Sequence, residues 1–476
     1  MASGLPDYVA SAKPLGADAR TSWFKSTAQA YAGIMLWFVF WQMVPSGGSA
    51  APGGFLGQGV GTAILALVAA ALICHFLFYL VPGMLGMKTG LPLYIVGTST
   101  YGVTGGFLMP GFLMGILQFG WLAVNAYFSS LFLVAPFFEN NLDVAANTPA
   151  HLIVGSVWAA LSALIGLKGI KYVARVATFL PLIPFVILIV LFVSSAGGLG
   201  KFDPNALVTA AKVAEPTAEP LSTFSIFALM IAYVVGFFAT AGAAGADFGM
   251  NNRNGKDVQL GGLFGIAIAT IFAGGLALLI VAGAYGKGLE GLSGLNPTQM
   301  MGAVMGNPTV GSVFMYLLAI AAFPAACFSS LIAANSFKAT LPKVNPFISC
   351  GIGTAVAIAL VISGWAGQAA QVFTVIGASF GPICGAMMAD YLLAGRKWAG
   401  PRAGFNMAGW ISWLVGFAVG NAPFLAKIES LKGIASQVPC PPVAAFVVGL
   451  VLYAVLAMIG LQGKKLEMPA AAPAGE

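Results

Sequence analysis

One short segment of the sequence combines a primary amide and a large aromatic ring on what would be a single helix face. Gln118, Phe119, Gly120 and Trp121 are consecutive, and Asn125 follows one turn later. Residues three apart share a side of a helix, so the Gln118 amide and the Trp121 ring would face the same way. The ring can stack on a flat ligand, and the amide can both donate and accept hydrogen bonds. The segment favours a site for a flat heteroaromatic molecule, although an amide bonded to a neighbouring helix and a core tryptophan would explain it at least as well.

The chain around this segment has the composition of a membrane protein. Of its 476 residues, 59% are hydrophobic and 7% are charged, whereas soluble domains carry about 25% charged residues. Residues 55–87 contain no Asp, Glu, Lys or Arg, and about 20 apolar residues suffice to cross a bilayer. The five cysteines have no metal-ligand spacing, and segment 1–22 lacks the apolar core of a signal peptide.

Twelve apolar segments can be drawn, which predicts an all-α membrane protein with 12 transmembrane helices. They cover about 26–45, 55–82, 107–135, 149–167, 173–196, 222–246, 259–285, 310–338, 346–365, 369–393, 407–424 and 441–462. Of the 21 Lys and Arg residues, 16 fall on the side of the two termini and five on the other. By the positive-inside rule, both termini are therefore expected in the cytoplasm. The net charge of +7 follows from this topology and requires no nucleic-acid partner.

The same segmentation predicts one membrane domain with two short tails. Residues 1–22 would form a cytoplasmic N-terminal tail and residues 464–476 a cytoplasmic C-terminal tail. Residues 23–463 would form a single transporter domain, with core helices at about 23–393 and terminal helices at about 407–462. The expected location is the inner (plasma) membrane.

Helix-breaking residues interrupt three of these segments. Ala32 and Gly33 lie in the first, the run 236–247 in the sixth is small and polar in its middle, and Pro324 lies in the eighth. Such residues are costly in the lipid core unless the freed backbone lines a cavity. The first and sixth segments hold equivalent places in two five-helix halves, so the paired breaks indicate a central site in an inverted-repeat transporter. Glycines can also serve only to let helices pack closely.

Ionisable side chains are scarce in the middle of the predicted spans. Of the 14 acids, only Asp247 and Asp390 adjoin spans, each near a cytoplasmic end, and His75 is the histidine placed well within one. A proton relay through Asp or Glu would therefore have no obvious carrier. A hard cation such as Na⁺ can instead be held by neutral oxygens, namely carbonyls at a broken helix and hydroxyls such as those of Ser329 and Ser330. This favours sodium as the coupling ion.

A series of different short motifs is distributed along most of the chain. They are Ser22-Trp23-Phe24-Lys25, Lys88-Thr89-Gly90-Leu91-Pro92, Tyr101-Gly102-Val103, Gln118-Phe119-Gly120-Trp121, Ala246-Asp247-Phe248, Arg253-Asn254, Ile332-Ala333-Ala334-Asn335-Ser336, Phe380-Gly381-Pro382-Ile383 and Ala389-Asp390-Tyr391. In this order and spacing the chain resembles the nucleobase:cation symporter-1 family, in particular its cytosine permeases and its purine and hydantoin transporters. The resemblance implies a LeuT-like fold: a 5+5 inverted repeat plus two terminal helices, with helices 1 and 6 broken.

The resemblance also implies a substrate site between spans one, three, six and eight. Trp121 and Phe238 would sandwich the substrate ring, and Gln118, Thr240 and Asn335 would hydrogen-bond it. Thr240 stands where cytosine permeases have a serine. Trp37 in span one would be a bulkier neighbour of the pocket.

A sodium site is implied in the same way. Its ligands would be the carbonyls of Gly33, Leu36 and Ala326 together with the hydroxyls of Ser329 and Ser330. Cytosine permeases have an asparagine in place of Ala326 and a Thr-Thr-Asn run in place of Ser329, Ser330 and the leucine that follows. These departures preserve a sodium site and leave the identity of the heterocycle open.

The sequence therefore predicts a secondary transporter that imports a nucleobase or similar flat heterocycle by cation symport and uses no cofactor beyond Na⁺. Its expected partners are the small-molecule substrate and the lipid bilayer, with no nucleic acid and no obligate protein partner. A proton-coupled carrier of a related amide or vitamin, such as a hydantoin, allantoin or thiamine, is the alternative. A channel would need rings of polar residues, and an enzyme would need a nucleophile–base or metal cluster; the sequence offers neither pattern.

Overall fold

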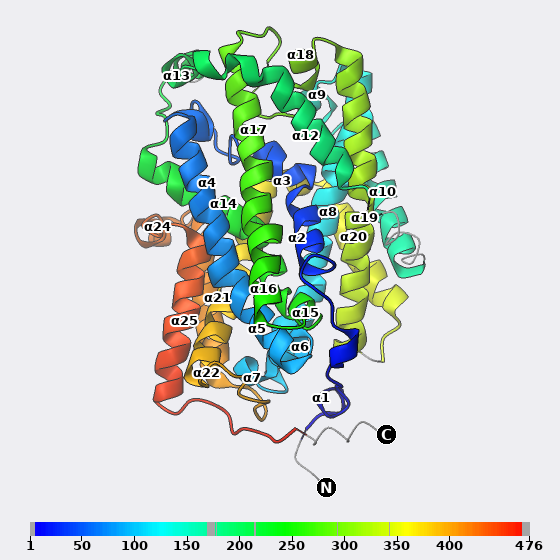
Figure 1. The fold of residues 1–476 in the computed structure, drawn as a ribbon, viewed down its shortest axis with the longest axis vertical. Helices are drawn as coiled ribbons and strands as arrows, with labels where there is room; N and C mark the ends of the chain where they lie inside the picture. The colour runs from blue at the N-terminus through cyan, green and yellow to red at the C-terminus, as the bar shows by residue number, and fades with distance from the viewer. Residues whose placement is uncertain are drawn as a thin grey trace.

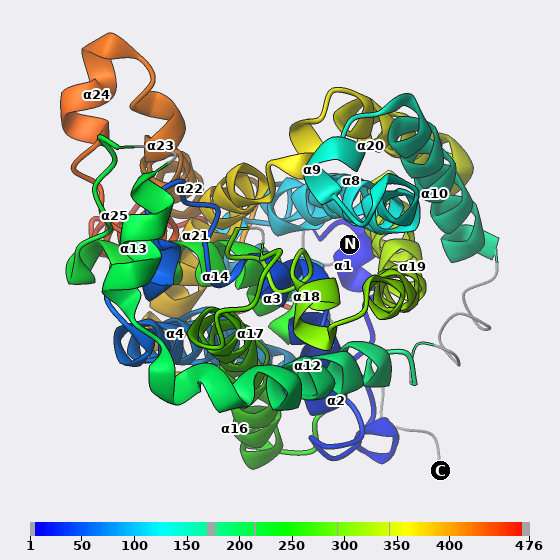
Figure 2. The same cartoon turned by 90° about the horizontal axis from the view of Figure 1, so that it is seen from above.

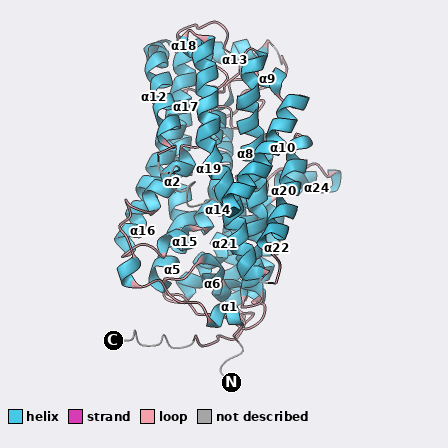
Figure 3. Cartoon of the chain, turned by 90° about the vertical axis from the view of Figure 1, so that its right-hand side faces the viewer, coloured by secondary structure: helices cyan, strands magenta, loops and turns pink. Residues whose placement is uncertain are grey.

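Helices make up the regular structure of the chain. A computed structural model describes residues 5–168, 177, 179–213, 216–292, 294–341 and 343–468. The longest helices run side by side along the long axis of the molecule, as two views at right angles show (Figures 1 and 3). The expected start of the fifth span, at 173–176, and the outer parts of the two tails, 1–4 and 469–476, lie outside the described residues.

Each of the 12 predicted segments is occupied by one helix or by two consecutive helices. They are α2 (Thr27–Met35) with α3 (Phe38–Met43), α4 (Val60–Ile73) with α5 (Leu80–Thr89), α8 (Leu113–Val134), α10 (Pro149–Lys168), α12 (Leu182–Ser195), α14 (Thr223–Ala243), α16 (Gly255–Gly262) with α17 (Ala269–Gly286), α19 (Pro308–Thr340), α20 (Pro346–Ile362), α21 (Ala369–Leu393), α22 (Met407–Gly420) and α25 (Pro441–Met458). Within the described residues, nine helices are long and apolar enough to cross a membrane, and α20 and α22 are shorter apolar helices. The prediction of an all-α membrane protein is confirmed.

Short helices lie at the two ends of this bundle. The end that carries both chain termini has α1 (Asp7–Ala10), α6 (Leu93–Val96) and α7 (Thr98–Tyr101), and the opposite end has α9 (Leu142–Ala145), α13 (Pro204–Lys212) and α18 (Met301–Met305) (Figure 1). Helix α15 (Gly245–Gly249) follows α14, and α23 (Ala422–Leu425) and α24 (Glu429–Ala435) connect α22 to α25. We refer to the first end as the terminal end.

The starts of helices α19 and α20 show how the sequence sets helix boundaries. Asn307 and Asn345 each accept a hydrogen bond from the backbone N–H two residues later. Pro308 and Pro346 then occupy the first helical position, where no intrahelical N–H is needed. The chain therefore enters both helices through the same capped turn.

The core helices form two groups that each draw on both halves of the chain. Helices α8, α10, α19 and α20 pack on one another and form what we call the α8 group. Helices α2, α4, α14 and α17, with the short helices that continue them, form the α14 group. Seen from above, α10, α19 and α20 lie to one side and α4 and α17 to the other (Figure 2). Each group thus combines spans from both predicted repeats.

Two π-helical turns mark equivalent places in the repeats. One joins α4 to α5 at Cys74–Tyr79 in the second span, and the other joins α16 to α17 at Leu263–Ile268 in the seventh. Spans two and seven correspond in a 5+5 repeat, and the two turns contact each other. A third π-helical turn, Phe107–Phe112, precedes α8 in the third span. Because π-turns are uncommon, the paired occurrence in spans two and seven supports an internal repeat.

The N-terminal segment runs across the terminal end of the bundle. The Tyr8 hydroxyl donates to the Val103 carbonyl, just before the third span. Further along, the Thr21 N–H donates to the Asn251 carbonyl at 2.7 Å, beyond the sixth span. The segment before span one therefore contacts both the α8 side and the α14 side of the molecule.

A buried ion pair fixes the two terminal helices to the core. Arg402 Nη2 lies 3.0 Å from Asp390 Oδ1, and both side chains are buried. The Tyr453 hydroxyl of α25 donates to the same carboxylate oxygen at 2.8 Å, and Asn406 Nδ2 donates to the Tyr453 hydroxyl at 3.2 Å. Arg402 Nε also donates to the Ser99 carbonyl of α7 at 2.8 Å. This network joins α21, α22, α25 and the loop between spans two and three.

Candidate functional site

Trp121 is surrounded by aromatic rings from three other spans. Its ring centroid lies 5.8 Å from that of Trp37, 5.2 Å from that of Phe237 and 5.3 Å from that of Phe373. Its indole Nε1 donates to Thr240 Oγ1 at 3.1 Å. Spans one, three, six and ten therefore converge on one tryptophan, and the sequence-predicted residues Trp37, Trp121 and Thr240 are brought together.

The α14 ring that meets Trp121 is Phe237 rather than its neighbour Phe238. Successive residues of a helix point about 100° apart, whereas residues three apart share a face. Phe237 and Thr240 are three apart and both meet Trp121, while Phe238 is fully buried with its ring 5.7 Å from that of Tyr31. The role of Phe238 as the second ring of a substrate sandwich stays a prediction.

Gln118 and Asn335 lie in different surroundings. Gln118 is buried on α8, and its Nε2 has the sulfur of Met114 as its hydrogen-bond acceptor, at 3.6 Å. A thioether is a weak acceptor, so the amide is poorly satisfied where it stands. Asn335 lies on α19 with its side chain exposed. Of these two amides, the structure buries Gln118 and leaves Asn335 open.

The first span is broken at Leu36 and Trp37, one turn later than Ala32 and Gly33 suggested. Trp37 has an extended backbone, φ −62° and ψ 127°, and separates α2 from α3. Gly33 lies within α2, where a Cβ would make only an ordinary contact of 3.6 Å with Pro181. The expected break at Gly33 is therefore wrong in position, because nothing there forces the helix to end.

The sixth span is interrupted near its terminal end and not in its middle. Helix α14 continues through Phe237 and Thr240 and ends at Ala243, and α15 begins after a turn at Ala244. The glycines of this run serve close packing instead. A Cβ at Gly236 would lie 2.8 Å from the Phe373 carbonyl oxygen, and one at Gly242 would lie 2.8 Å from Phe78 Cβ. Close contact between helices, the alternative explanation of these glycines, holds for both.

The predicted sodium ligands on α19 include one unpartnered hydroxyl. Ser329 Oγ donates to the carbonyl of Ala325 at 3.3 Å, the usual bond to the preceding turn. Ser330 is fully buried, and its Oγ has no hydrogen-bond partner within the described chain. Ala326 is also fully buried. A buried hydroxyl without a partner is costly, which fits an oxygen that serves as a ligand.

Two polar groups at the break of span one have unused hydrogen-bonding capacity. The indole Nε1 of Trp37 is buried and has no partner among the described residues. The carbonyl of Leu36 accepts a hydrogen bond from Trp41 Nε1 at 3.2 Å, and a carbonyl oxygen retains a second lone pair. The break therefore presents one free donor and one acceptor with spare capacity.

Two aromatic residues of the cluster were missed by sequence reasoning. Phe373 on α21 and Phe237 contact Trp121, and their own rings are 5.3 Å apart. Phe237 had a usable signal, because it precedes Thr240 by three residues on the same helix. Phe373 is one of 35 phenylalanines, and no motif around it distinguished it from the others.

Asn125, one turn after Trp121, is hydrogen-bonded to neighbouring helices. Its Nδ2 donates to the Ala322 carbonyl of α19 at 3.0 Å, and its Oδ1 accepts from Trp158 Nε1 of α10 at 3.1 Å. Ser129 donates to the same oxygen at 3.3 Å. Asn125 thus ties three helices of the α8 group together beside the aromatic cluster.

Comparison with known proteins identifies the family. The family model described as permease for cytosine/purines, uracil, thiamine and allantoin matches residues 25–429 of this chain. The chain belongs to this family of permeases. It is therefore a transporter of the nucleobase:cation symporter-1 type, as the motif order indicated.

Curated relatives agree with this assignment. The cytosine permease of Escherichia coli K12 is 26% identical over 319 residues, which cover 66% of this chain and 67% of that protein. The cytosine permease of Escherichia coli O157:H7 matches with the same figures.

Solved structures share the fold across almost the whole chain. The nucleobase-cation-symport-1 transporter Mhp1, closed with bromovinylhydantoin bound, superposes with a TM-score of 0.65 at 14% identity and covers 96% of both chains. Its inward-facing form gives a TM-score of 0.59 at 17% identity and covers 94% of both. A Na⁺-coupled sialic acid symporter, outward-open with substrate bound, gives 0.52 at 12% identity over 97% of this chain and 93% of that one. The predicted LeuT-like fold is confirmed.

Proposed function

We propose that this permease imports a nucleobase or similar flat heterocycle by Na⁺ symport. The observation that carries the proposal is the aromatic cluster around Trp121, in which rings from spans one, six and ten enclose an indole bonded to Thr240. Large flat rings favour stacked or edge-on contact with another ring. A planar, partly polar substrate suits such a lining better than a sugar or an ion does.

Six side chains would bind the substrate. They are Trp121, Gln118, Phe238, Thr240, Asn335 and Trp37. The Trp121 ring would stack on the heterocycle, and the poorly satisfied Gln118 amide would turn from the Met114 sulfur to the polar edge of the ligand. The free indole N–H of Trp37 would supply a further donor. Such groups discriminate strongly, because an analogue without the matching atoms leaves them unpaired.

Transport would proceed by alternating access between the α8 group and the α14 group. Trp121 belongs to the first, and Phe237, Thr240 and Trp37 belong to the second, so the cluster lies across the boundary between them. Rocking of one group against the other would open this boundary to one side of the membrane at a time. A bound ring would bridge the two groups in the closed form.

Sodium would bind between α19 and the break of span one. The carbonyls of Gly33, Leu36 and Ala326 and the hydroxyls of Ser329 and Ser330 would provide five oxygens, as hard cations prefer. The unpartnered Ser330 hydroxyl supports this set. One structural relative is described as Na⁺-coupled.

A proton-coupled carrier of a hydantoin, allantoin or thiamine is the second candidate. It is supported by His75, which is buried in the π-helical turn of span two with an Nδ1 that has no partner among the described residues. The family description includes thiamine and allantoin. In this case His75 and Asp247 would be the groups to test for the proton.

The proposed topology has both termini in the cytoplasm of a cell whose inner (plasma) membrane holds the protein. Residues 1–22 and 464–476 would be cytoplasmic tails and 23–463 the single transmembrane domain. The terminal end would then face the cytoplasm, in line with the excess of Lys and Arg there.

Uptake into proteoliposomes tests the proposal. Purified protein is reconstituted, and uptake of radiolabelled cytosine, uracil, purines, a hydantoin, allantoin and thiamine is measured under an inward Na⁺ gradient, a pH gradient or neither. We expect saturable uptake of at least one flat heterocycle that the Na⁺ gradient accelerates. Uptake that follows only the pH gradient would support the second candidate, and equal passage of all solutes without saturation would contradict a carrier.

A further inference from the structure

Helices α21 and α25 pack against each other, and an apolar groove lies along the edge of their contact. At the point of contact the helices meet through glycine: a Cβ at Gly385 would lie 2.1 Å from the Phe446 carbonyl oxygen, and one at Gly449 would lie 2.4 Å from that of Pro382. Small residues permit this close approach. Towards the terminal end, a groove of about 420 Å³ lies between the C-terminal parts of the two helices.

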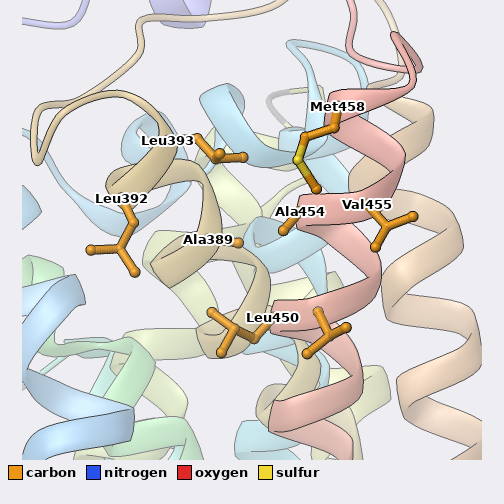
Figure 4. Close-up of a pocket in the computed structure, with 8 residues that line it drawn as sticks. Ala389, Leu392, Leu393, Leu450, Ala454, Val455 and Met458 are labelled. Atoms are coloured by element: carbon orange, nitrogen blue, oxygen red, sulfur yellow. The ribbon is translucent and has the colours of Figure 1, made fainter.

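The groove is lined by apolar side chains from both helices (Figure 4). Ala389, Leu392 and Leu393 line it from α21, and Leu450, Ala454 and Met458 are among the residues that line it from α25. Leu393 is 50% exposed and Met458 is 71% exposed, so the groove opens outward. It lies apart from the Trp121 cluster and plays no part in the substrate site. On this face of a membrane protein, the groove would meet lipid chains.

The chain that leaves the groove at its terminal end is basic. Shortly after Leu393, Gly395 and Arg396 adopt positive φ angles of 67° and 61°, and Lys397 follows. Lys88 Nζ donates to the Arg396 carbonyl at 2.6 Å, which brings a third cation to the same turn. The turn therefore gathers three positive charges at the mouth of the groove.

These cations have no acidic partner in the part of the chain that the structure describes. The ion pairs found there are Lys212–Glu219, Arg253–Asp257, Arg402–Asp390 and Lys432–Glu429, and none involves Lys88, Arg396 or Lys397. The nearest acid along α21, Asp390, is neutralised by Arg402 at 3.0 Å. Beyond α25, Lys464 and Lys465 add further positive charge against Glu467, and the Lys464 carbonyl accepts from the Ala403 N–H at 2.8 Å.

We propose that this groove binds an acyl chain of an anionic phospholipid whose phosphate is held by Arg396 and Lys397. An apolar slot that continues into unpaired cations at headgroup depth matches the two parts of such a lipid. A guanidinium binds phosphate oxygens in a two-pronged arrangement, and Lys88 adds attraction from the same turn. A zwitterionic lipid would fill the slot equally well and gain less at its mouth. The proposal does not depend on the transported substrate.

The test compares two lipids on the wild-type protein. The full chain is reconstituted with phosphatidylglycerol or phosphatidylcholine that carries a photoreactive group in one acyl chain, and the labelled residues are mapped by mass spectrometry. We expect phosphatidylglycerol to label residues 389–393 and 450–458 several-fold more than phosphatidylcholine does. Equal labelling by the two lipids would overturn the proposal, as would cross-links to a second copy of the chain in place of lipid.

Matched variants separate the two parts of the site. Arg396→Gln with Lys397→Gln should remove the preference for phosphatidylglycerol, whereas Lys427→Gln with Lys432→Gln, at the opposite end of α22 and α25, should keep it. Ala454→Trp should fill the groove and abolish labelling by both lipids, whereas Leu414→Trp, on the exposed face of α22, should not. Unchanged labelling in the Arg396 and Lys397 variant, or in Ala454→Trp, would contradict the site even if all variants fold.

Discussion

The buried polar groups around Asp390 have hydrogen-bond partners, whereas several of those at the candidate site do not. At the terminal end, Asp390 accepts from Arg402 and Tyr453, and Asn406 donates to the Tyr453 hydroxyl and to the Thr100 carbonyl. Partners from three helices and a loop satisfy these four side chains, though the neighbouring Tyr101 hydroxyl has none within the described chain.

Among the predicted site residues, several hydrogen-bond partners are poor or absent. The Trp37 indole N–H and the Ser330 hydroxyl have no partner among the described residues, and the Gln118 amide has a sulfur. Each such group lowers stability, by about 1–3 kcal/mol when it is fully unsatisfied. What holds this region together is ring packing around Trp121.

The difference separates scaffold from site. A fully satisfied network is rigid and fixes one arrangement of its helices, which suits the attachment of α22 and α25 to the core. Buried polar groups without a partner are rare in native proteins, and a ligand that completes them gains affinity. We therefore expect mutations in the first region to affect folding and mutations in the second to affect transport.

The largest effect is expected at Arg402. Arg402→Met would leave the Asp390 carboxylate buried without its cation, at a cost of about 3–5 kcal/mol. The yield of folded protein and its unfolding temperature, measured in detergent, should both fall sharply. Combining Arg402→Met with Asp390→Asn should restore much of the stability, because no buried charge then remains. A single variant as stable as the wild type would show that the pair is not part of the scaffold.

The next effect is expected at Trp121. Trp121→Ala removes a stacking surface worth about 0.5–1.5 kcal/mol beyond its buried area, so uptake should fall by about tenfold or more while membrane expression stays the same. Trp413→Ala is the control, because its indole donates to the Ser379 carbonyl of the scaffold at 3.0 Å. Wild-type substrate affinity in Trp121→Ala would place this residue outside the site.

A more selective effect is expected at Gln118. Gln118→Ala should weaken binding of the preferred heterocycle by about 1–3 kcal/mol, and of an analogue without the matching polar atoms far less. Competition with a set of analogues measures the difference. If the binding of both ligands weakens equally, the Gln118 amide has a structural role. This is the alternative explanation given for its segment, an amide bonded to a neighbouring helix.

The smallest effect is expected at Asp247, a carboxyl that accepts a hydrogen bond from the backbone. Its Oδ1 accepts from the Leu93 N–H at 2.9 Å, and burial raises the pKa of its carboxyl from 3.8 to about 6. The phenols of Tyr31 and Tyr94 are its titratable neighbours. Because the folded-state pKa lies above the unfolded value, this group favours the folded state below about pH 4 and loses that contribution as the pH rises through 6.

Thermal unfolding at several pH values tests this statement. Between pH 5 and pH 7 the wild type should lose about 1 °C more than Asp247→Asn does, which corresponds to about 1 kcal/mol for a chain of 476 residues. The amide introduced by this substitution would keep an oxygen acceptor for the Leu93 N–H but cannot ionise. Identical pH profiles for the two proteins would mean that the carboxyl titrates normally.

The sequence predicted the membrane helices well, because a run of about 20 apolar residues is recognisable without knowledge of how the helices pack. All 12 segments are occupied by helices, and the LeuT-like arrangement holds. The break in span one was placed a turn too early, because Gly33 is tolerated inside α2 and Trp37, where the break lies, is not a helix-breaking residue type. The contact with Trp121 was harder to predict, since Phe237 and Phe238 are chemically identical and only the helix phase relative to α8 separates them.

Sodium-dependent substrate binding tests the central claim, that the unpartnered groups in the centre are ligand sites. Affinity of the purified protein for its substrate is measured by equilibrium binding in Na⁺ and in choline. The variant carries Ser329→Ala with Ser330→Ala, and the control carries Ser379→Ala with Ser412→Ala, whose hydroxyls both donate to carbonyls of their own helices. Ion and substrate raise each other's affinity by one common factor.

We predict that Na⁺ raises affinity in the wild type and in the control, and that the Ser329 and Ser330 variant keeps only weaker, sodium-independent binding. Ser330→Ala alone should account for most of the loss, because Ser329 already donates to Ala325. A full sodium response in the double variant would contradict the account, and so would a wild type whose uptake ignores Na⁺ and follows a pH gradient.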